Sequence, residues 1–60
     1  MDPRATLADM LDYVEMHEYA DAAECAVNLK RWICSGGFVP AGYTRNELRA
    51  KCNRVIDLAA

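Results

Sequence analysis

Residues 22–37 read Ala-Ala-Glu-Cys-Ala-Val-Asn-Leu-Lys-Arg-Trp-Ile-Cys-Ser-Gly-Gly, and they decide the fold of this 60-residue chain. Apolar side chains recur here at intervals of three and four residues, which gathers them on one face of a helix: Ala22, Cys25, Ala26, Leu29, Trp32 and Ile33. Glycine adopts the left-handed conformation in which helices commonly end, and Gly36 and Gly37 follow directly. The pattern predicts a helix over residues 21–35 that buries one face.

A second apolar stripe lies upstream, formed by Leu7, Met10, Leu11 and Val14. It is offset from the first stripe by roughly sixty degrees around an ideal helix of about 3.6 residues per turn. Asp21 and Glu24 have the spacing of a capping pair, so a turn is expected near Tyr19–Asp21. The sequence therefore predicts two helices, over residues 4–18 and 21–35. One continuous helix through both is the alternative.

A third helix is predicted downstream of an apolar connector that contains Pro40 and Gly42. Thr44 and Glu47 form a capping box, which marks the start of a helix over residues 44–58. Its apolar stripe consists of Leu48, Cys52, Val55, Ile56 and Ala59. We therefore expect an all-α fold, a single small three-helix domain over residues 1–60.

The size of the chain favours self-association. A 60-residue domain buries only about 60% of the surface that its unfolded chain exposes, so a lone core is marginal. We accordingly expect a homo-oligomer, most simply a homodimer. No stretch reads as a membrane span or as a signal peptide, and the three cysteines are an odd number that favours free thiols. A cytoplasmic location is expected.

The charges divide the chain into an acidic front and a basic back. Residues 1–24 hold seven acids against one base, whereas residues 25–60 hold six bases against two acids. The acids recur every third residue: Asp9, Asp12, Glu15, Glu18, Asp21 and Glu24. Such a face either mimics nucleic-acid phosphates before a basic protein or is simply solvated.

Four bases on the third predicted helix suggest nucleic acid as an alternative ligand: Arg45, Arg49, Lys51 and Arg54. A small DNA-binding transcriptional regulator would use them on a recognition helix. The isoelectric point of about 5.1 and the long connector before this helix argue against that use. Pairing of these bases with the acidic helices is the expected structural role.

No set of side chains has the spacing of a catalytic or metal site. The cysteines and His17 form neither a C-x-x-C nor an H-x-x-x-H pair, with which closed zinc sites usually begin. No nucleophile is accompanied by a base at a sensible spacing. We therefore expect neither an enzyme nor a bound cofactor or metal.

The aromatic residues around the connector provide the most distinctive local feature. Trp32, Phe38 and Tyr43 suit a protein interface, in which aromatic side chains act as anchors. Equally, Trp32 can pack beneath the connector and close a small core. The predicted partner-binding surface comprises these three aromatic residues together with Asp9, Asp12 and Glu15. The expected function is that of a non-enzymatic protein–protein interaction module.

The stretch Ala22–Pro40 resembles segments of short, uncharacterised helical proteins encoded by bacteriophages and related mobile elements. The resemblance rests on Ala22, Ala23, Ala26, Asn28, Leu29 and Trp32, followed by Gly36, Gly37, Phe38 and Pro40. It implies a phage or bacterial origin and a partner among host proteins, such as a nuclease, a polymerase or a defence complex, which the protein would inhibit or modulate. It carries no catalytic residue with it.

Overall fold

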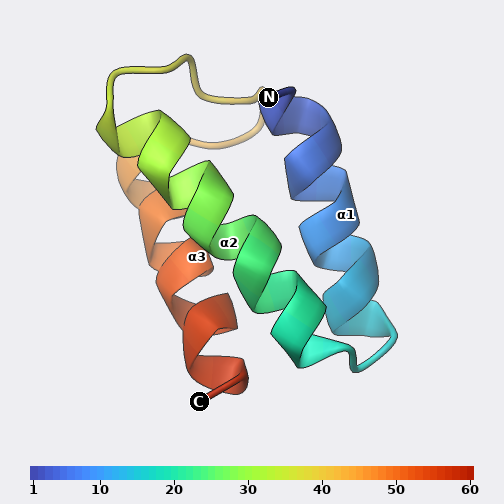
Figure 1. Ribbon diagram of the computed structural model, residues 1–60. Coiled ribbons are helices and arrows are strands. Elements are labelled where there is room, and N and C mark those ends of the chain that lie inside the picture. Colours follow the sequence, from blue (N-terminus) through green and yellow to red (C-terminus); the bar gives the residue numbers. More distant parts are fainter.

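The computed structural model describes all 60 residues and contains three helices (Figure 1). These are α1 (Pro3–Glu15), α2 (Tyr19–Cys34) and α3 (Arg45–Leu58). The prediction of a small all-α three-helix domain is confirmed, and the first two helices are separate rather than continuous. None of the three combines the length and the apolar character that crossing a membrane requires.

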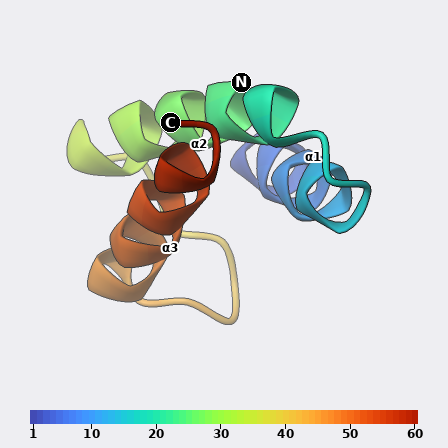
Figure 2. The ribbon, with the colours of Figure 1, turned by 90° about the horizontal axis from the view of Figure 1, so that it is seen from below.

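Helix α2 is the central element of the fold. It packs along both α1 and α3, whereas α1 and α3 barely touch each other. Both lie on the same side of α2, so that the three helices form two layers (Figure 2). They also run in the same direction, opposite to α2, and the connector between α2 and α3 crosses the end of the bundle near the N-terminus (Figure 1).

The core consists of nine buried apolar residues: Leu7, Met10, Ala22, Ala26, Leu29, Ile33, Leu48, Cys52 and Val55. Four of them belong to α2, which is the only helix that packs against both others. Two of these four are the small residues Ala22 and Ala26, both fully buried, and the other two are Leu29 and Ile33. The predicted stripe of α2 is therefore the centre of the core.

The total surface of the chain is that of an ordinary folded monomer. Its accessible area is 3855 Å², and the area expected for a compact protein of this mass is about 3,900 Å². The exposed area thus agrees with the size scaling from which a marginal core was expected.

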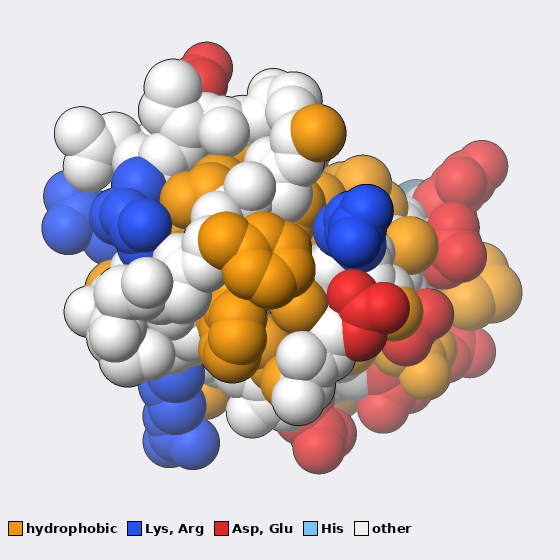
Figure 3. All heavy atoms as spheres, turned by 90° about the horizontal axis from the view of Figure 1, so that it is seen from above, with side chains coloured by type: hydrophobic (Ala, Val, Ile, Leu, Met, Phe, Trp, Pro, Cys, Tyr) orange, Lys and Arg blue, Asp and Glu red, His pale blue; other side chains and the backbone are white.

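The opposite charges of the two halves of the chain remain segregated in the fold. In a view onto the connector end, most acidic side chains lie on one side and most basic side chains on the other, with an apolar patch between them (Figure 3). The segregation follows the helices, because α1 and the first turns of α2 carry most of the acids and α3 carries most of the bases. The molecule thus has an acidic side and a basic side.

The turn between α1 and α2 differs from the prediction. Helix α1 ends at Glu15, three residues early, and the turn comprises Met16–Glu18 instead of Tyr19–Asp21. The predicted Asp21–Glu24 capping pair is wrong, because α2 begins at Tyr19 and its N-cap Glu18 makes no side-chain cap bond. The turn is closed by His17 in the left-handed conformation (φ 60°) and by the backbone bond from the N–H of Glu18 to the carbonyl of Tyr13 (2.8 Å). This is the hydrogen-bond pattern with which helices commonly end at a glycine.

We expect His17→Gly to stabilise the protein, because His17 occupies a conformation that costs a side-chain-bearing residue about 1 kcal/mol or more. The imidazole is exposed, and the substitution removes its 2.7 Å hydrogen bond to the hydroxyl of Tyr19 and its edge-to-face contact with the Tyr19 ring. A rise in melting temperature of several degrees is expected in thermal denaturation. His17→Ala is the control, since it removes the same bond without relieving the backbone. A Gly variant that melts with or below the Ala variant would contradict this account of the turn.

The other helix ends behave as the sequence predicts. The backbone N–H of Gly37 donates to the carbonyl of Trp32 (3.0 Å), and Gly36 has φ 93°, so α2 ends with the left-handed glycine that was expected. The capping box of α3 is complete: Thr44 Oγ1 accepts from the N–H of Glu47 (3.1 Å), and Glu47 Oε1 accepts from the N–H of Thr44 (2.9 Å). These bonds to Thr44 lower the pKa of the Glu47 carboxyl group.

Candidate functional site

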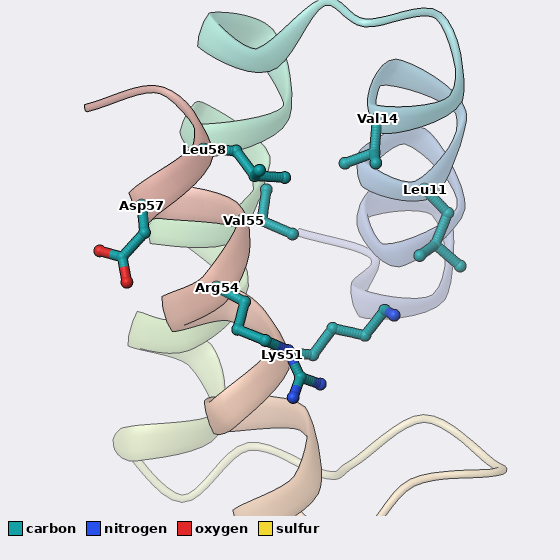
Figure 4. A pocket seen from close by; sticks show the side chains of 7 residues that line it. All are labelled: Leu11, Val14, Lys51, Arg54, Val55, Asp57 and Leu58. Carbon is teal, nitrogen blue, oxygen red and sulfur yellow. The ribbon is translucent and has the colours of Figure 1, made fainter.

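The largest hollow of the molecule is a groove between α1 and α3, which we call the α1–α3 groove (Figure 4). It has a volume of about 390 Å³ and exists because α1 and α3 each pack on α2 but hardly on each other. Helix α1 contributes two of its lining residues and α3 contributes five: Leu11, Val14, Lys51, Arg54, Val55, Asp57 and Leu58. No residue of α2 lines it.

The walls of the α1–α3 groove expose apolar side chains. Leu11 on α1 is 37% exposed and Leu58 on α3 is 49% exposed, with Val14 and Val55 deeper between them. The prediction that Leu11 belongs to the core is therefore wrong. The apolar stripe of α1 is wider than its contact with α2, so Leu7 and Met10 are buried while Leu11 faces the gap.

The charged residues that line the groove all belong to α3. On the α3 wall, Lys51 reaches toward α1 and Arg54 also borders the groove, while the carboxylate of Asp57 points away from it (Figure 4). On the α1 wall, Glu15 follows Leu11 by one helical turn and shares its flank. Glu15 itself does not line the groove, so the groove has a basic rim on its α3 side and an exposed leucine on each wall.

The structure divides the four predicted nucleic-acid-binding bases between two flanks of α3. Lys51 and Arg54 border the α1–α3 groove. Arg45 and Arg49 lie one turn apart on a different flank, where the Arg45 guanidinium donates to the carbonyl of Ile33. The division arises because residues six or nine positions apart do not share one side of a helix with about 3.6 residues per turn. The four bases do not form one patch.

Helices α2 and α3 border a second, shallower hollow of about 300 Å³, lined by Val27, Lys30, Arg31, Cys34 and Ile56. Here Lys30 Nζ donates to Asn53 Oδ1 (2.7 Å), so one of its two bases is already engaged in joining α2 to α3. Lys30 and Arg31 of α2 add to the basic side of the molecule, which the sequence pattern does not predict. These two bases lie beside those of α3 only because α2 packs against α3.

The predicted partner-binding residues do not converge on one site. Trp32 is half-buried against the core, its indole Nε1 donates to the carbonyl of Phe38 (2.9 Å), and the two rings meet edge to face with centroids 5.7 Å apart. Tyr43 is also half-buried, while Phe38 is 54% exposed. The acidic residues Asp9, Asp12 and Glu15 are exposed along α1, and Glu15 ends that helix away from the connector. Trp32 therefore holds the connector in place.

The three cysteines are free thiols in different surroundings. Burial raises the pKa of the Cys25 thiol, and nearby carboxylates, first that of Asp9, raise it further. Burial likewise raises the pKa of Cys52, which is part of the core. Cys34 is exposed. No three side chains of His, Cys, Asp or Glu gather as a metal ion would require.

No protein family model, curated protein or solved structure matches this chain. The function is therefore argued from the geometry of the α1–α3 groove. A small-molecule site typically adds a few convergent polar groups to its apolar walls. This groove instead offers apolar walls with charged rims, the arrangement that suits the side chains of an amphipathic helix.

Proposed function

We propose that the protein is a non-enzymatic protein-interaction module and that the α1–α3 groove receives an amphipathic helix. The observation that carries the proposal is the exposure of Leu11 and Leu58 on facing walls of one groove. Scattered exposed leucines are ordinary on protein surfaces, but apolar side chains that share a concave site are a feature of docking grooves. Burial of these two leucines against a partner is favourable, because it removes their apolar surface from water.

The basic rim defines the chemistry of the bound helix. Lys51 and Arg54 border the groove, and Asp57 points out of it. A complementary helix therefore carries apolar residues at intervals of three or four with carboxylates along one edge. The carboxylates orient the helix and speed its encounter, while the apolar residues supply most of the affinity.

A sharper version of this proposal concerns the identity of the partner. The resemblance to phage-encoded proteins favours a host protein, and the exposed acids of α1 favour a basic target such as a nucleic-acid enzyme. Direct DNA binding by α3 has weaker support, because its bases lie on two flanks and Arg45 is engaged with α2.

The proposal is tested with a labelled synthetic helix that carries leucines at i and i+4 and glutamates beside them, using fluorescence anisotropy at low protein concentration. We expect this peptide to bind at least tenfold more tightly than a version with lysines in place of the glutamates. Leu58→Ser should weaken its binding by about tenfold, since burying a leucine side chain is worth about 1.5 kcal/mol or more.

The matched control is Phe38→Ser, which removes a side chain of similar exposure at the connector. This variant should bind the acidic peptide like the wild type. If Phe38→Ser weakens binding and Leu58→Ser does not, the interaction surface is the connector and the groove proposal is wrong. Equal binding of both peptides would refute the role of the basic rim.

A further inference from the structure

We propose that the helix bound in the α1–α3 groove has a fixed direction: it runs antiparallel to α1 and α3, with its carboxylates in its C-terminal half. The inference rests on the proposed function and defines the chemistry of the partner more closely. Two features carry it, namely the position of the basic rim along the groove and the direction of the helices that form the walls.

The groove occupies the place of a missing fourth helix. Helices α1 and α3 lie on the same side of α2 and run opposite to it (Figures 1 and 2), and no residue of α2 lines the groove. A helix in the groove therefore contacts α1 and α3 from the side that faces away from α2. If it runs antiparallel to both, every neighbouring pair of the four helices is antiparallel, as in up-down-up-down bundles.

The bases lie toward one end of the groove. On the α3 wall, Lys51 and Arg54 precede Leu58 by seven and four residues, so Lys51 lies toward the connector (Figure 4). At about 1.5 Å of rise per residue, Lys51 and Leu58 are about 10 Å apart along the helix axis. Bases attract both the carboxylates of a bound helix and the negative pole at its C-terminal end. This end of the groove therefore favours the C-terminal half of the bound helix.

The opposite end of the groove favours the N-terminal end of a bound helix. Helices α1 and α3 both end there (Figure 1), and neither has a basic residue in its last turn, whereas α2 has Arg31 in that position. The last turn of α1 instead contains Asp12 and Glu15, and that of α3 contains Asp57. Two negative helix poles are thus left without a cation, and the positive pole of a bound helix complements them.

The partner is consequently an amphipathic segment with an unusual distribution of charge. Its apolar residues, three or four positions apart, meet Leu11 and Leu58. A carboxylate that meets Lys51 follows about seven residues after the apolar residue that meets Leu58, because the two helices have the same rise. Carboxylates are unfavourable near the C-terminal end of a helix, so we expect this segment to have little helix content when free and to become helical on docking.

Two fluorescent peptides of the same composition test the direction by anisotropy. One carries its glutamates in the C-terminal half. The other is the same sequence in reverse, which moves the glutamates to the N-terminal half and keeps the apolar spacing. We expect the C-terminally acidic peptide to bind at least about tenfold more tightly. The comparison is stringent, because the reversed peptide forms the more stable free helix.

A nitroxide joined by an amide bond to one end of the C-terminally acidic peptide reports the direction of the peptide in the complex. On the N-terminal end, the nitroxide should broaden the backbone amide signal of Leu58 more than that of Lys51. On the C-terminal end, it should broaden Lys51 more than Leu58. The opposite order in both experiments would overturn the inference.

A new base at the end of α3 tests the role of the helix poles. Ala59→Lys should reduce the preference for the C-terminally acidic peptide by about threefold or more. Ala41→Lys is the control, because it makes the same change at an exposed position of the connector and should leave the preference within about twofold. An Ala59→Lys variant that keeps the full preference would contradict the role assigned to the ends of α1 and α3.

The outcome also separates this inference from the proposed function. Equal binding of both peptides, with Leu58→Ser weakening each of them, would refute the fixed direction and leave the groove as a docking site. If neither peptide binds, or if both bind without any effect of Leu58→Ser, the proposed function fails and the direction of the bound helix fails with it.

Discussion

Leu29→Ala is expected to unfold most of the protein or to lower its melting temperature by at least about 10 °C. Leu29 is fully buried on α2, the helix against which both others pack. Removing a buried leucine side chain costs about 2–5 kcal/mol, and a 60-residue domain has a total stability of only about 3–9 kcal/mol. Each kcal/mol corresponds to about 4–8 °C in a domain of this size.

Thermal denaturation followed by circular dichroism measures this effect. Leu58→Ala is the control, because it makes the same substitution at a side chain that is 49% exposed on the groove wall. Its melting temperature should stay within a few degrees of the wild-type value. If the two variants melt alike, α2 is not the centre of the core.

The second large effect is expected where the connector folds over Trp32. A Cβ atom at position 37 would lie 2.3–2.6 Å from atoms of the Trp32 indole, so Gly37→Ala must displace that ring. The displacement would break the bond from Trp32 Nε1 to the carbonyl of Phe38 and the contact between the two rings. Overpacking of this kind costs about 1–3 kcal/mol.

A double-mutant cycle isolates the cause of this loss. Trp32→Ala alone should cost about 3 kcal/mol, the lower end of the range for aromatic residues, because Trp32 is only half-buried. Gly37→Ala should then add almost nothing. The two substitutions should therefore be coupled by at least about 1 kcal/mol. Gly36→Ala is the control: it has open space but φ 93°, so its cost should be independent of Trp32. Additive effects of Gly37→Ala and Trp32→Ala would show that the ring does not occupy this position.

Local signals account for the parts of the fold that the sequence predicted. The stripe centred on Leu29, the left-handed Gly36 and the Thr44–Glu47 capping box each act within a few residues, and each appears in the structure as expected. The end of α1 was misplaced because its left-handed residue is His17 rather than glycine. The sequence around it, Glu-Met-His-Glu, lacks both Gly and Pro, the residues by which such a turn is recognised.

The α1–α3 groove could not be predicted, because it depends on how two helices diverge from a third. Leu11 fits the apolar stripe of α1, and only the distance from α3 leaves it exposed. Leu58 lies near the chain end, where no periodic signal distinguishes a groove wall from a frayed turn. Likewise, the four bases of α3 form one cluster in the sequence but lie on two flanks of the helix. The sequence does show the acidic and basic halves of the chain, but not which of their residues border a groove.

Intermolecular nuclear Overhauser effects between the isotope-labelled protein and the unlabelled acidic peptide test the α1–α3 groove as a docking site most directly. In a spectrum filtered for contacts between the two molecules, we expect cross-peaks from the peptide to the methyl groups of Leu11 and Leu58. If the peptide binds but the filtered cross-peaks arise only from the connector around Phe38 or from the outer face of α2, the α1–α3 groove is not the docking surface.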